Sequence, residues 1–369
     1  MKVLFLTNIP SPYRVDFFGE LAKYCDLTVL YEMGSATDRD VEWFRADRDN
    51  GTYQSVFLKP IIKQSSSAWC PSVKRYLKKG VYDIIIIGVY STPTGMYAIH
   101  YLKCHHMPYA INCDGGFVPS AERSLKFKLK RYFISGAKFY LCSGTYSDAY
   151  LIYYGAYPDA VRHYPFSPLH EAEILQGPVS EEEKRRLRKE LGWKEEKIIL
   201  SVGSFIPRKG FDILIKTASE LQDRYGVYIV GGNDTEQYRQ LIELYKLEHV
   251  HFLPFMKSNT IKKCYMSADV FVLPTREDIW GLVINEAMAV GLPVITTDRC
   301  VAGMELLENK SIVPVEDSET LGRKIEQLMR SDDLRKQEGK RNLERIRDYT
   351  IENMAKTHWD IIASECISM

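Results

Sequence analysis

Short apolar runs alternate with longer segments of helical periodicity along most of the chain. The runs are rich in Val, Ile and Leu and are nearly continuous, as in strands of a parallel sheet that helices cover on both faces. They predict strands at residues 3–8, 27–31, 84–89, 109–112 and 139–143, and again at 198–202, 227–230, 250–253, 270–274, 294–297 and 311–314. Because helices separate the strands in both series, the pattern predicts an α/β fold with two Rossmann-like, doubly wound domains.

The two series are separated by residues 165–180, which lack a clear period and contain three prolines. A charged helix follows, with Ser180 as its N-cap and Glu183 at the capping-box position. We therefore expect one domain over residues 1–170 and a second over residues 171–349. Ligands of such sheets bind beyond the carboxyl ends of the strands, so the two domains are expected to face each other across a cleft.

Composition excludes several other classes of protein. A chain of 369 residues with 45% hydrophobic and 26% charged residues is neither fibrous nor disordered. The eight cysteines form no CxxC pair and no cluster at zinc spacing, so we expect reduced core residues and no metal site. The first apolar run is too short for a signal peptide, and no run reaches the ~18 residues of a membrane span. These features predict a cytoplasmic protein or one bound at a membrane surface.

The formal net charge of +1 conceals an asymmetry between the two halves. Residues 1–170 hold 20 Lys and Arg against 14 Asp and Glu, whereas the remainder holds 29 against 34. Six basic residues and no acidic residue lie between residues 50 and 82, and the same is true of residues 123–138. Such runs suit an anionic lipid surface or a phosphate-bearing partner, although a solvated helix face explains them equally well.

The most informative part of the sequence follows the fourth predicted strand of the second series. This strand leads into the acidic pair Glu277-Asp278, and Gly281 and Leu282 then open a helix that carries Glu286 near its start. A helix N-terminus after a strand, with a glycine where the backbone must be approached closely, suits an anion. A carboxylate one turn into the helix repels an anion but accepts hydrogen bonds from hydroxyls. Phosphate beside hydroxyls indicates a sugar nucleotide.

A second cluster follows the first strand of the second series. That strand ends at Gly203-Ser204, and a turn with Arg208, Lys209 and a further glycine leads into the next helix. Lys is a point charge and Arg a bidentate donor, so together they suit a diphosphate. Two cations in a loop are by themselves a weak indication. Their place in the same sheet as the acidic pair makes the combination specific.

Together these elements resemble glycosyltransferase family 4, whose members are retaining sugar-nucleotide glycosyltransferases with the two-Rossmann GT-B architecture. The family pattern has an acidic residue, seven residues, Glu and Ala, and then a Gly-x-Pro-Val turn. This chain has Asp278, Glu286, Ala287 and the turn from Gly291 to Val294. Relatives usually have Glu at the first position, so either Asp278 or the preceding Glu277 is expected to face the donor sugar.

The family's other motif is Gly-Arg, followed after a short loop by Lys-Gly. Gly203, Lys209 and Gly210 fit this motif, but Ser204 stands where relatives have the arginine. The resemblance therefore implies that Arg208, from farther along the loop, supplies the missing guanidinium to the leaving diphosphate.

The first half of the chain also resembles the family. Arg14, in the loop after the first strand, is expected to meet an acceptor phosphate, and the alternative is a surface arginine that caps the loop. Asp114 stands before two glycines at the end of a strand, near the place where many members have a His that contacts the donor sugar. It is the candidate substitute for that His; otherwise it is an ordinary turn residue.

The resemblance places Met256 and Phe255 along the base of the nucleotide, although core packing explains their apolar character equally well. The turn Gly231-Gly232-Asn233 matches a donor-side turn of the family, with Gly232 as the binding residue. A lone pair of glycines is weak support, because any tight turn uses it.

The resemblance implies retaining transfer of a sugar from a nucleotide-diphosphate sugar, UDP- or GDP-linked, without a required metal or other cofactor. The acceptor would be a glycan or a lipid-diphosphate-linked molecule in surface polysaccharide or glycoconjugate assembly. Residues 1–170 would face the acceptor, residues 171–349 would bind the donor, and residues 350–369 would form a helix that crosses back to the first domain. The basic first half would place the protein peripherally at the inner face of the membrane, and no nucleic-acid partner is expected.

Other functions stay open at this point. A nucleotide-sugar epimerase of similar fold would release a changed sugar nucleotide without an acceptor. A non-catalytic nucleotide-sugar-binding partner would show neither transfer nor donor hydrolysis. A dinucleotide-dependent dehydrogenase is disfavoured, because no GxGxxG follows the first strand of either series.

Overall fold

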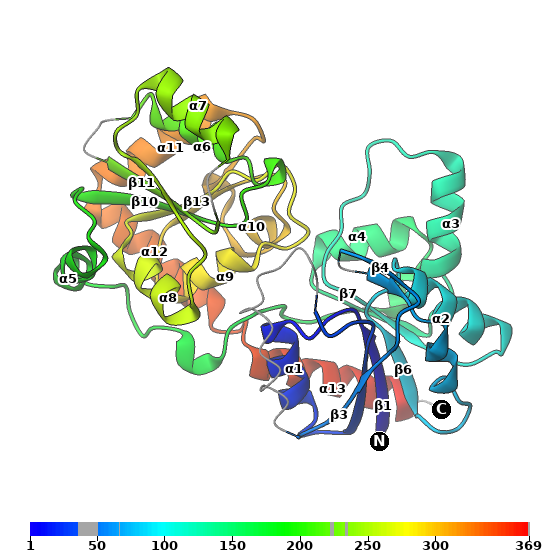
Figure 1. Ribbon diagram of the computed structural model, residues 1–369. Coiled ribbons are helices and arrows are strands. Elements are labelled where there is room, and N and C mark those ends of the chain that lie inside the picture. Colours follow the sequence, from blue (N-terminus) through cyan, green and yellow to red (C-terminus); the bar gives the residue numbers. More distant parts are fainter. Residues whose placement is uncertain (36–50, 66, 222–224, 233–234, 368–369) are drawn as a thin grey trace. The chain divides into compact units, whose positions relative to one another are not determined.

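The computed structural model of the 369-residue chain describes residues 1–35, 51–65, 67–221, 225–232 and 235–367. The chain divides into two compact units (Figure 1). Unit 1 comprises Met1–Pro168 together with Thr350–Met369, and unit 2 comprises Leu169–Tyr349. The division falls inside the proline-containing segment, and the last helix belongs to the same unit as the first half of the chain.

Unit 1 is built on a parallel sheet with the strand order β3-β2-β1-β6-β7-β8-β9. Its strands are β1 (Lys2–Thr7), β2 (Asp26–Tyr31), β3 (Gln54–Phe57), β6 (Ile84–Ile87), β7 (Ala110–Cys113), β8 (Phe139–Cys142) and β9 (Val161–His163). A small antiparallel pair lies outside this sheet and consists of β4 (Ile62–Gln64) and β5 (Ser67–Trp69). The helices are α1 (Pro12–Leu21), α2 (Pro93–Cys104), α3 (Ser124–Ile134), α4 (Thr145–Tyr153) and α13 (Ile351–Ile367), with 3-10 turns at η3 (Pro71–Arg75) and η4 (Pro158–Ala160).

Unit 2 repeats this plan with a parallel sheet of order β12-β11-β10-β13-β14-β15. Its strands are β10 (Lys197–Val202), β11 (Tyr225–Val230), β12 (Val250–Leu253), β13 (Val270–Leu273), β14 (Val294–Thr297) and β15 (Ile312–Val313). The helices are α5 (Glu181–Leu191), α6 (Phe211–Ala218), α7 (Glu236–Tyr245), α8 (Ser258–Ser267), α9 (Leu282–Ala289), α10 (Val301–Leu306), α11 (Ser318–Arg330) and α12 (Asp332–Ile346). Three 3-10 turns complete the unit at η5 (Glu171–Glu173), η6 (Pro207–Lys209) and η7 (Asn309–Ser311).

Both sheets are the doubly wound parallel sheets that the apolar pattern predicts, and every predicted strand is present with its ends displaced by two residues or fewer. The pattern missed β3 and β9, at the two edges of the first sheet, and the β4–β5 pair. These strands are short and partly exposed, so they carry no continuous apolar run. In each sheet the strand order reverses between two central strands, β1 and β6 or β10 and β13, which is where sheets of this kind bind ligands.

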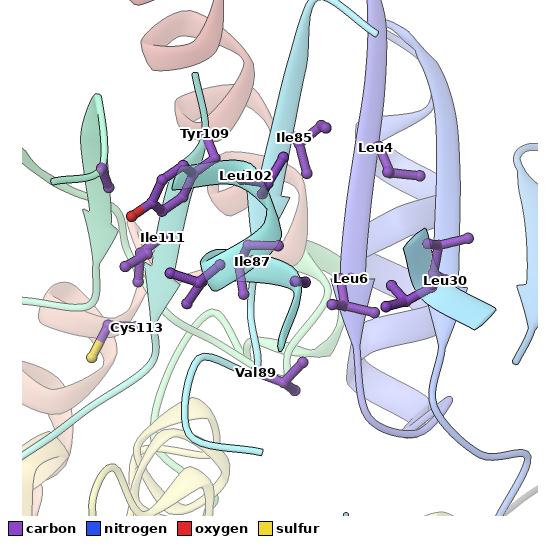
Figure 2. Packing of buried hydrophobic residues seen from close by; sticks show 14 of the residues in the cluster. Leu4, Leu6, Leu30, Ile85, Ile87, Val89, Leu102, Tyr109, Ile111 and Cys113 are labelled. Atoms are coloured by element: carbon purple, nitrogen blue, oxygen red, sulfur yellow. The ribbon is translucent and has the colours of Figure 1, made fainter. Parts of the chain in front are cut away.

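The core of unit 1 shows why its sheet must be covered on both faces. Side chains of β1, β2 and β6, such as Leu6, Leu30 and Ile87, point to one face of the sheet together with Leu102 of α2 (Figure 2). On α1 and α13, which pack against each other, the rings of Phe17 and His358 have centroids 4.7 Å apart. Helix α13 is therefore part of the core of unit 1, although most of the chain separates it from the other elements. Among the described helices, none is both long and apolar enough to cross a bilayer.

The start of unit 2 follows the predicted capping chemistry in part. Ser180 is the N-cap of α5, and its hydroxyl accepts a hydrogen bond of 3.2 Å from the backbone amide of Glu183. The Glu183 carboxylate accepts hydrogen bonds from Arg186 one turn farther on, at 2.6 and 2.8 Å. Helix α5 thus has the expected N-cap, while the Glu183 side chain stabilises the exposed face of the helix.

Candidate functional site

Two loops predicted separately from the sequence meet at the carboxyl edge of the sheet in unit 2. The turn η6 follows β10, and the acidic loop follows the neighbouring strand β13. The carbonyl oxygen of Arg208 accepts hydrogen bonds from the amide of Arg276 at 2.8 Å and from the hydroxyl of Thr275 at 3.0 Å. The two loops are therefore joined through the backbone at the switch point of the sheet, where such folds bind ligands.

Charged side chains from both loops form one compact group. The Lys209 ammonium donates to an oxygen of the Asp278 carboxylate, and Nη1 of Arg208 lies 3.6 Å from the other oxygen. The side chains of Lys209 and Asp278 are only 12% and 10% exposed, whereas that of Arg208 is 44% exposed. Two cations share one carboxylate, so the group has an excess positive charge beside a helix N-terminus. This arrangement favours an anionic ligand.

The two acidic residues that the sequence left as alternatives have different surroundings in the structure. The amide of Asp278 donates to the carbonyl of Arg299 at 2.7 Å, and its carbonyl accepts from the amide of Val301 at 3.1 Å. These bonds fix the backbone of Asp278 to the loop after β14, and its side chain faces Lys209. The Glu277 side chain is exposed, and only its backbone carbonyl contacts the guanidinium of Arg208. Asp278 is therefore the carboxylate that pairs with the two cations.

Gly210 explains how the turn reaches the acidic loop. It has φ of +68° and ends the 3-10 turn Pro207–Lys209 while opening α6. A Cβ atom at this position would lie 2.0 Å from the carbonyl oxygen of Pro274, at the end of β13. Only glycine allows the turn to rest on that strand end, and this contact places Lys209 beside Asp278.

Replacement of Gly210 by alanine is expected to destabilise unit 2 and to separate Lys209 from Asp278. The left-handed backbone costs a non-glycine residue roughly 1–2 kcal/mol, and the clash with Pro274 adds to this. Gly192 is a matched control, because it has φ of +73° at the end of α5 and a Cβ atom there would meet nothing within 4 Å. Urea unfolding should show a clearly larger loss of free energy for G210A than for G192A. Equal losses would contradict the role assigned to the Pro274 contact.

Helix α9 begins where the sequence predicts, with Gly281 as N-cap and Leu282 as first residue. Its first turn is fixed by the indole of Trp280, which donates to the side-chain carbonyl of Asn285 at 2.9 Å. The amide of Ala302 donates to the carbonyl of Trp280 at 2.9 Å. The N-terminus of α9 is thereby held close to Asp278, and its positive end adds to the field of the two cations.

Glu286 lies one turn into α9, and its carboxylate accepts a hydrogen bond of 2.7 Å from the hydroxyl of Tyr265 in α8. Burial, against the opposing effect of the hydrogen bond from Tyr265 and with a contribution from the nearby Glu173 carboxylate, raises the pKa of Glu286 to about 7. Burial and Glu286 together raise the pKa of Tyr265 well above 10, so this hydroxyl stays a donor. Tyr265 was not identifiable from the sequence, because nothing in its helix marks it as a partner of a carboxylate 21 residues later.

The predicted residues that follow β10 and β11 differ in exposure and packing. Gly203 follows β10 next to the aliphatic part of Lys209, while the Ser204 side chain is exposed. In the glycine turn after β11, the backbone approaches most closely at Gly231, where a Cβ atom would lie 2.2 Å from the carbonyl oxygen of Gly203. At Gly232, the residue predicted to bind the donor, it would lie 3.0 Å from the ring of Phe205, so packing restricts Gly231 to glycine more strictly than Gly232. Asn233 lies outside the described residues.

The loop after β12 carries the two residues predicted to line the base. Phe255 is 45% exposed and is an apolar surface beside the site's sheet edge. Met256 is half-buried, and its sulfur accepts a contact of 3.6 Å from the thiol of Cys264. Phe255 is thus the residue of the pair with the larger exposed apolar surface.

Arg14 and Asp114 both belong to unit 1, where they pair with each other. Arg14 is 5% exposed, and its guanidinium is surrounded by the rings of Phe5, Tyr13 and Phe17. Burial alone would lower its pKa, but Asp114 reverses this and raises it. The alternative of a surface arginine that caps the loop is wrong, because the side chain is buried, whereas its contact with an acceptor phosphate stays a prediction. Helix α1 already begins at Pro12, which turns Arg14 inward.

A buried network connects this ion pair to the last helix. One oxygen of the Asp114 carboxylate accepts from the side-chain amide of Asn112 at 2.8 Å and from the hydroxyl of Tyr164 at 2.7 Å. The amide oxygen of Asn112 lies 2.9 Å from Nε2 of His358 in α13, 246 residues later in the chain. Asp114 is therefore more than a turn residue, and no local sequence pattern could have identified its partners.

Arg276 is a further member of the site that sequence reasoning missed. Its guanidinium pairs with the carboxylate of Asp212 in α6 at 2.6 Å and with Glu316, and these hydrogen bonds raise its pKa. It also donates to the carbonyl of Pro207. Arg276 thereby connects the η6 turn, α6 and Glu316. The sequence signal that could have identified it is its position directly before the acidic pair.

Within the described residues, no three His, Cys, Asp or Glu side chains gather as ligands for a metal ion.

Comparison with known families places this site in a defined segment. Residues 183–345, less than half of the chain, match the family model for glycosyl transferases group 1. An uncharacterized glycosyltransferase of Methanocaldococcus jannaschii is 36% identical over 138 residues, which cover 36% of this chain and 35% of that protein. The O-antigen biosynthesis glycosyltransferase WclY of Escherichia coli is 31% identical over 151 residues, or 40% of each chain. The chain thus matches two fifths or less of the length of these relatives.

Solved structures resemble the whole chain at low sequence identity. Sucrose-phosphate synthase of Thermosynechococcus elongatus aligns with a TM-score of 0.79 at 17% identity, and both chains are covered in full. Anabaena HepE in complex with UDP and glucose aligns with a TM-score of 0.78 at 17% identity, over 99% of this chain and 100% of that one. These likenesses establish the fold as the GT-B architecture of two Rossmann-like domains.

Proposed function

We propose that this chain is a retaining glycosyltransferase that moves a sugar from a nucleotide-diphosphate sugar to a glycan or lipid-linked acceptor. The observation that carries the proposal is the group of Lys209, Arg208 and Asp278 at the switch point of unit 2. It lies at the N-terminus of α9 and inside the segment that matches group 1 glycosyl transferases. Unit 2 takes the donor and unit 1 the acceptor.

The residues of unit 2 have complementary roles in this proposal. Departure of the diphosphate puts negative charge on the β-phosphate, which Lys209, Arg208 and the amides at Gly281 and Leu282 stabilise electrostatically. Glu286 accepts hydrogen bonds from the ribose hydroxyls. In this proposal transfer requires no metal or other cofactor. The acceptor oxygen attacks the anomeric carbon from the face that the diphosphate leaves, and the departing phosphate takes up the acceptor's proton, so no enzyme nucleophile is needed.

Asp278 orients hydroxyls of the donor sugar. Gly203, Ser204 and Gly232 border the diphosphate, while Phe255 and Met256 border the base. UDP- and GDP-sugars are the proposed donors, and a neighbour of the same fold solved with UDP supports a nucleotide-bound donor in general. Asp114 is the candidate of unit 1 for contact with the donor sugar, through the carboxylate that Arg14, Asn112 and Tyr164 hold in place.

The proposed acceptor and cellular location rest on the basic charge of residues 1–170 and on the names of the relatives. The excess of basic residues in residues 1–170 suits a lipid-diphosphate-linked or otherwise anionic acceptor at the inner face of a membrane. A relative named for O-antigen biosynthesis supports a role in surface polysaccharide assembly. The protein would then act from the cytoplasm as a peripheral membrane enzyme.

Binding and product analysis together test the proposal. A thermal-shift screen across UDP-, GDP-, ADP- and dTDP-sugars should raise the melting temperature with one donor class, because a ligand that binds only the folded state stabilises it. Mass spectrometry of that donor with lipid extract should then show transfer or slow hydrolysis. An isomerised nucleotide sugar would identify an epimerase, and binding without turnover would identify a non-catalytic partner.

Asp278 and Glu277 make a matched pair for testing which carboxylate orients the sugar. We expect Asp278→Asn to lower turnover at least about 100-fold, since the amide holds Lys209 less firmly and accepts hydrogen bonds from the sugar hydroxyls more weakly, so the donor is misplaced. Glu277→Gln should leave turnover close to wild type, because that side chain is exposed and contributes to the site through its backbone. Initial rates of sugar release measure both, and a larger loss for Glu277→Gln would reverse the assignment.

Donor affinity should depend on pH through Glu286. Burial is the main cause that raises its pKa to about 7. Below that pH the Glu286 carboxyl group is protonated, and it accepts hydrogen bonds from the ribose hydroxyls less well. The affinity should therefore rise with pH up to about 7 and level off above it, and fall up to about tenfold per pH unit below it. Calorimetry should use an intact nucleotide sugar, since a terminal phosphate itself titrates near pH ~6. Glu286→Gln should abolish the pH dependence, and an unchanged profile would contradict the assignment.

A further inference from the structure

Helix α3 carries an apolar stripe on the surface of unit 1. Leu125, Leu129 and Tyr132 are 78%, 50% and 42% exposed. Their spacing of four and three residues places them on one face of the helix. The hydroxyl of Tyr132 lies 2.8 Å from Nδ1 of His100 in α2, so the two leucines are the most open part of the stripe.

The opposite face of α3 already supplies the contacts that hold it to unit 1. Ile134 is 1% exposed and belongs to the core, and the ring of Phe127 packs on that of Tyr153 with centroids 5.2 Å apart. The ammonium of Lys130 lies 2.9 Å from both the hydroxyl of Tyr154 and the carboxylate of Glu122. The exposed stripe is thus not needed to hold α3 in unit 1, because the opposite face makes those contacts.

Cations border the stripe on both sides. On the helical wheel Lys128 lies next to Leu125 on one flank and Lys126 on the other, and both side chains are exposed. No acidic residue occurs from Arg123 to residue 138, and the nearest carboxylate, that of Glu122, is 3.8 Å from Lys126 and mainly engaged by Lys130. An apolar stripe between cations suits a partner with an apolar interior and an anionic surface.

We propose that α3 is the surface through which unit 1 lies on an anionic lipid bilayer. Leu125 and Leu129 enter the boundary between headgroups and acyl chains, while Lys126 and Lys128 contact lipid phosphates, as in amphipathic helices that lie in the interface. The inference deepens the proposed function, because a lipid-linked acceptor is reached from such a surface. Its geometry does not depend on that function.

Exposure alone does not lead to this assignment. Leu244 in α7 of unit 2 is 69% exposed, yet it follows Glu243, and no other large apolar side chain of this fully described helix is exposed. Single exposed leucines of this kind are ordinary in globular proteins. The difference lies in the repeat of the apolar positions and in the sign of the charges beside them. Leu244 therefore provides the matched control.

Vesicle flotation of the full chain tests the proposal. Wild type should float with vesicles of phosphatidylcholine containing phosphatidylglycerol and stay behind with phosphatidylcholine alone. Lys126→Gln/Lys128→Gln should weaken the partition about 30-fold, since each cation near an anionic surface contributes roughly fivefold to it. Leu125→Ser/Leu129→Ser should weaken it at least about tenfold even at low salt, because the apolar contact is lost.

Controls separate this inference from the donor site and from other partners. Leu244→Ser and Lys336→Gln/Lys340→Gln, in unit 2, should float like wild type, and all variants should bind the nucleotide sugar equally. Flotation unchanged by both α3 variants, or lost equally in the unit 2 variants, would overturn the proposal. It would also be overturned if the leucine variant only converted a dimer to a monomer. If wild type floats but does not bind the nucleotide sugar, this result would count against the proposed function alone.

Discussion

Lys209→Ala is expected to lower turnover by about 100- to 1000-fold, as removal of one preorganised charge-stabilising donor does in other enzymes. Its ammonium is the least exposed cation of the site, and it already pairs with Asp278 at the switch point of the sheet. Without it, Asp278 keeps only Arg208, at 3.6 Å, and the β-phosphate loses its nearest point charge. Single-turnover rates with a saturating nucleotide sugar measure the effect on the chemical step.

Two variants control this experiment. Lys209→Arg keeps the charge and should recover part of the rate, whereas Lys216→Ala removes an exposed lysine from α6 of the same unit and should leave the rate unchanged. Circular dichroism should show the same fold for all three. A rate for Lys209→Ala within a few-fold of wild type would exclude the proposed role of Lys209 and with it the diphosphate position.

Asp269→Ala is expected to destabilise unit 2 by about 3–5 kcal/mol, the cost of removing one partner from a buried ionic group. Asp269 is 1% exposed at the start of β13, and its carboxylate accepts from Arg188 at 2.8 Å, from Lys184 at 3.2 Å and from the amide of Ile198 at 2.8 Å. Arg335 of α12 lies at 4.0 Å. The variant would leave these buried cations with too little negative charge. The expected loss is a large part of the free energy of unfolding of a domain.

Urea unfolding followed by circular dichroism measures this loss as a shift of the transition that belongs to unit 2. Asp333→Ala is the matched control, because that residue is exposed in the first turn of α12 and should cost at most about 1 kcal/mol. If the two variants unfold at the same urea concentration, the ionic group around Asp269 does not hold α5 and α12 to the sheet.

The strands of both sheets could be predicted because burial on two faces leaves a local mark. A strand such as β13 must be apolar at every position, so its residues reveal it without knowledge of its neighbours. Strand β3 is an edge strand with two exposed ends, and its four residues carry no such mark. The sequence pattern therefore predicts the centre of each sheet and both edges of the second sheet, but misses both edges of the first.

The candidate site was predictable as far as its residues follow strand ends. Lys209 and Asp278 stand after strands that any doubly wound order would bring near one edge of the sheet. The sequence left open whether Glu277 or Asp278 faces the donor sugar, and it could not show that Asp278 pairs with Lys209, because neighbouring residues differ in the direction of their side chains. That direction is set by hydrogen bonds to Arg299 and Val301, which belong to another strand's loop.

The sequence by itself determined the α/β class, the two series of strands, and the pairing of basic and acidic loops that indicates a diphosphate beside hydroxyls. Only the tertiary structure decided that Arg14 is buried against Asp114, that Tyr265 binds Glu286, and that His358 contacts Asn112. The physical reason is the range of the interactions. Periodicity and turn chemistry act between residues close in the chain, whereas a buried polar group takes its partner from whichever element packs against it.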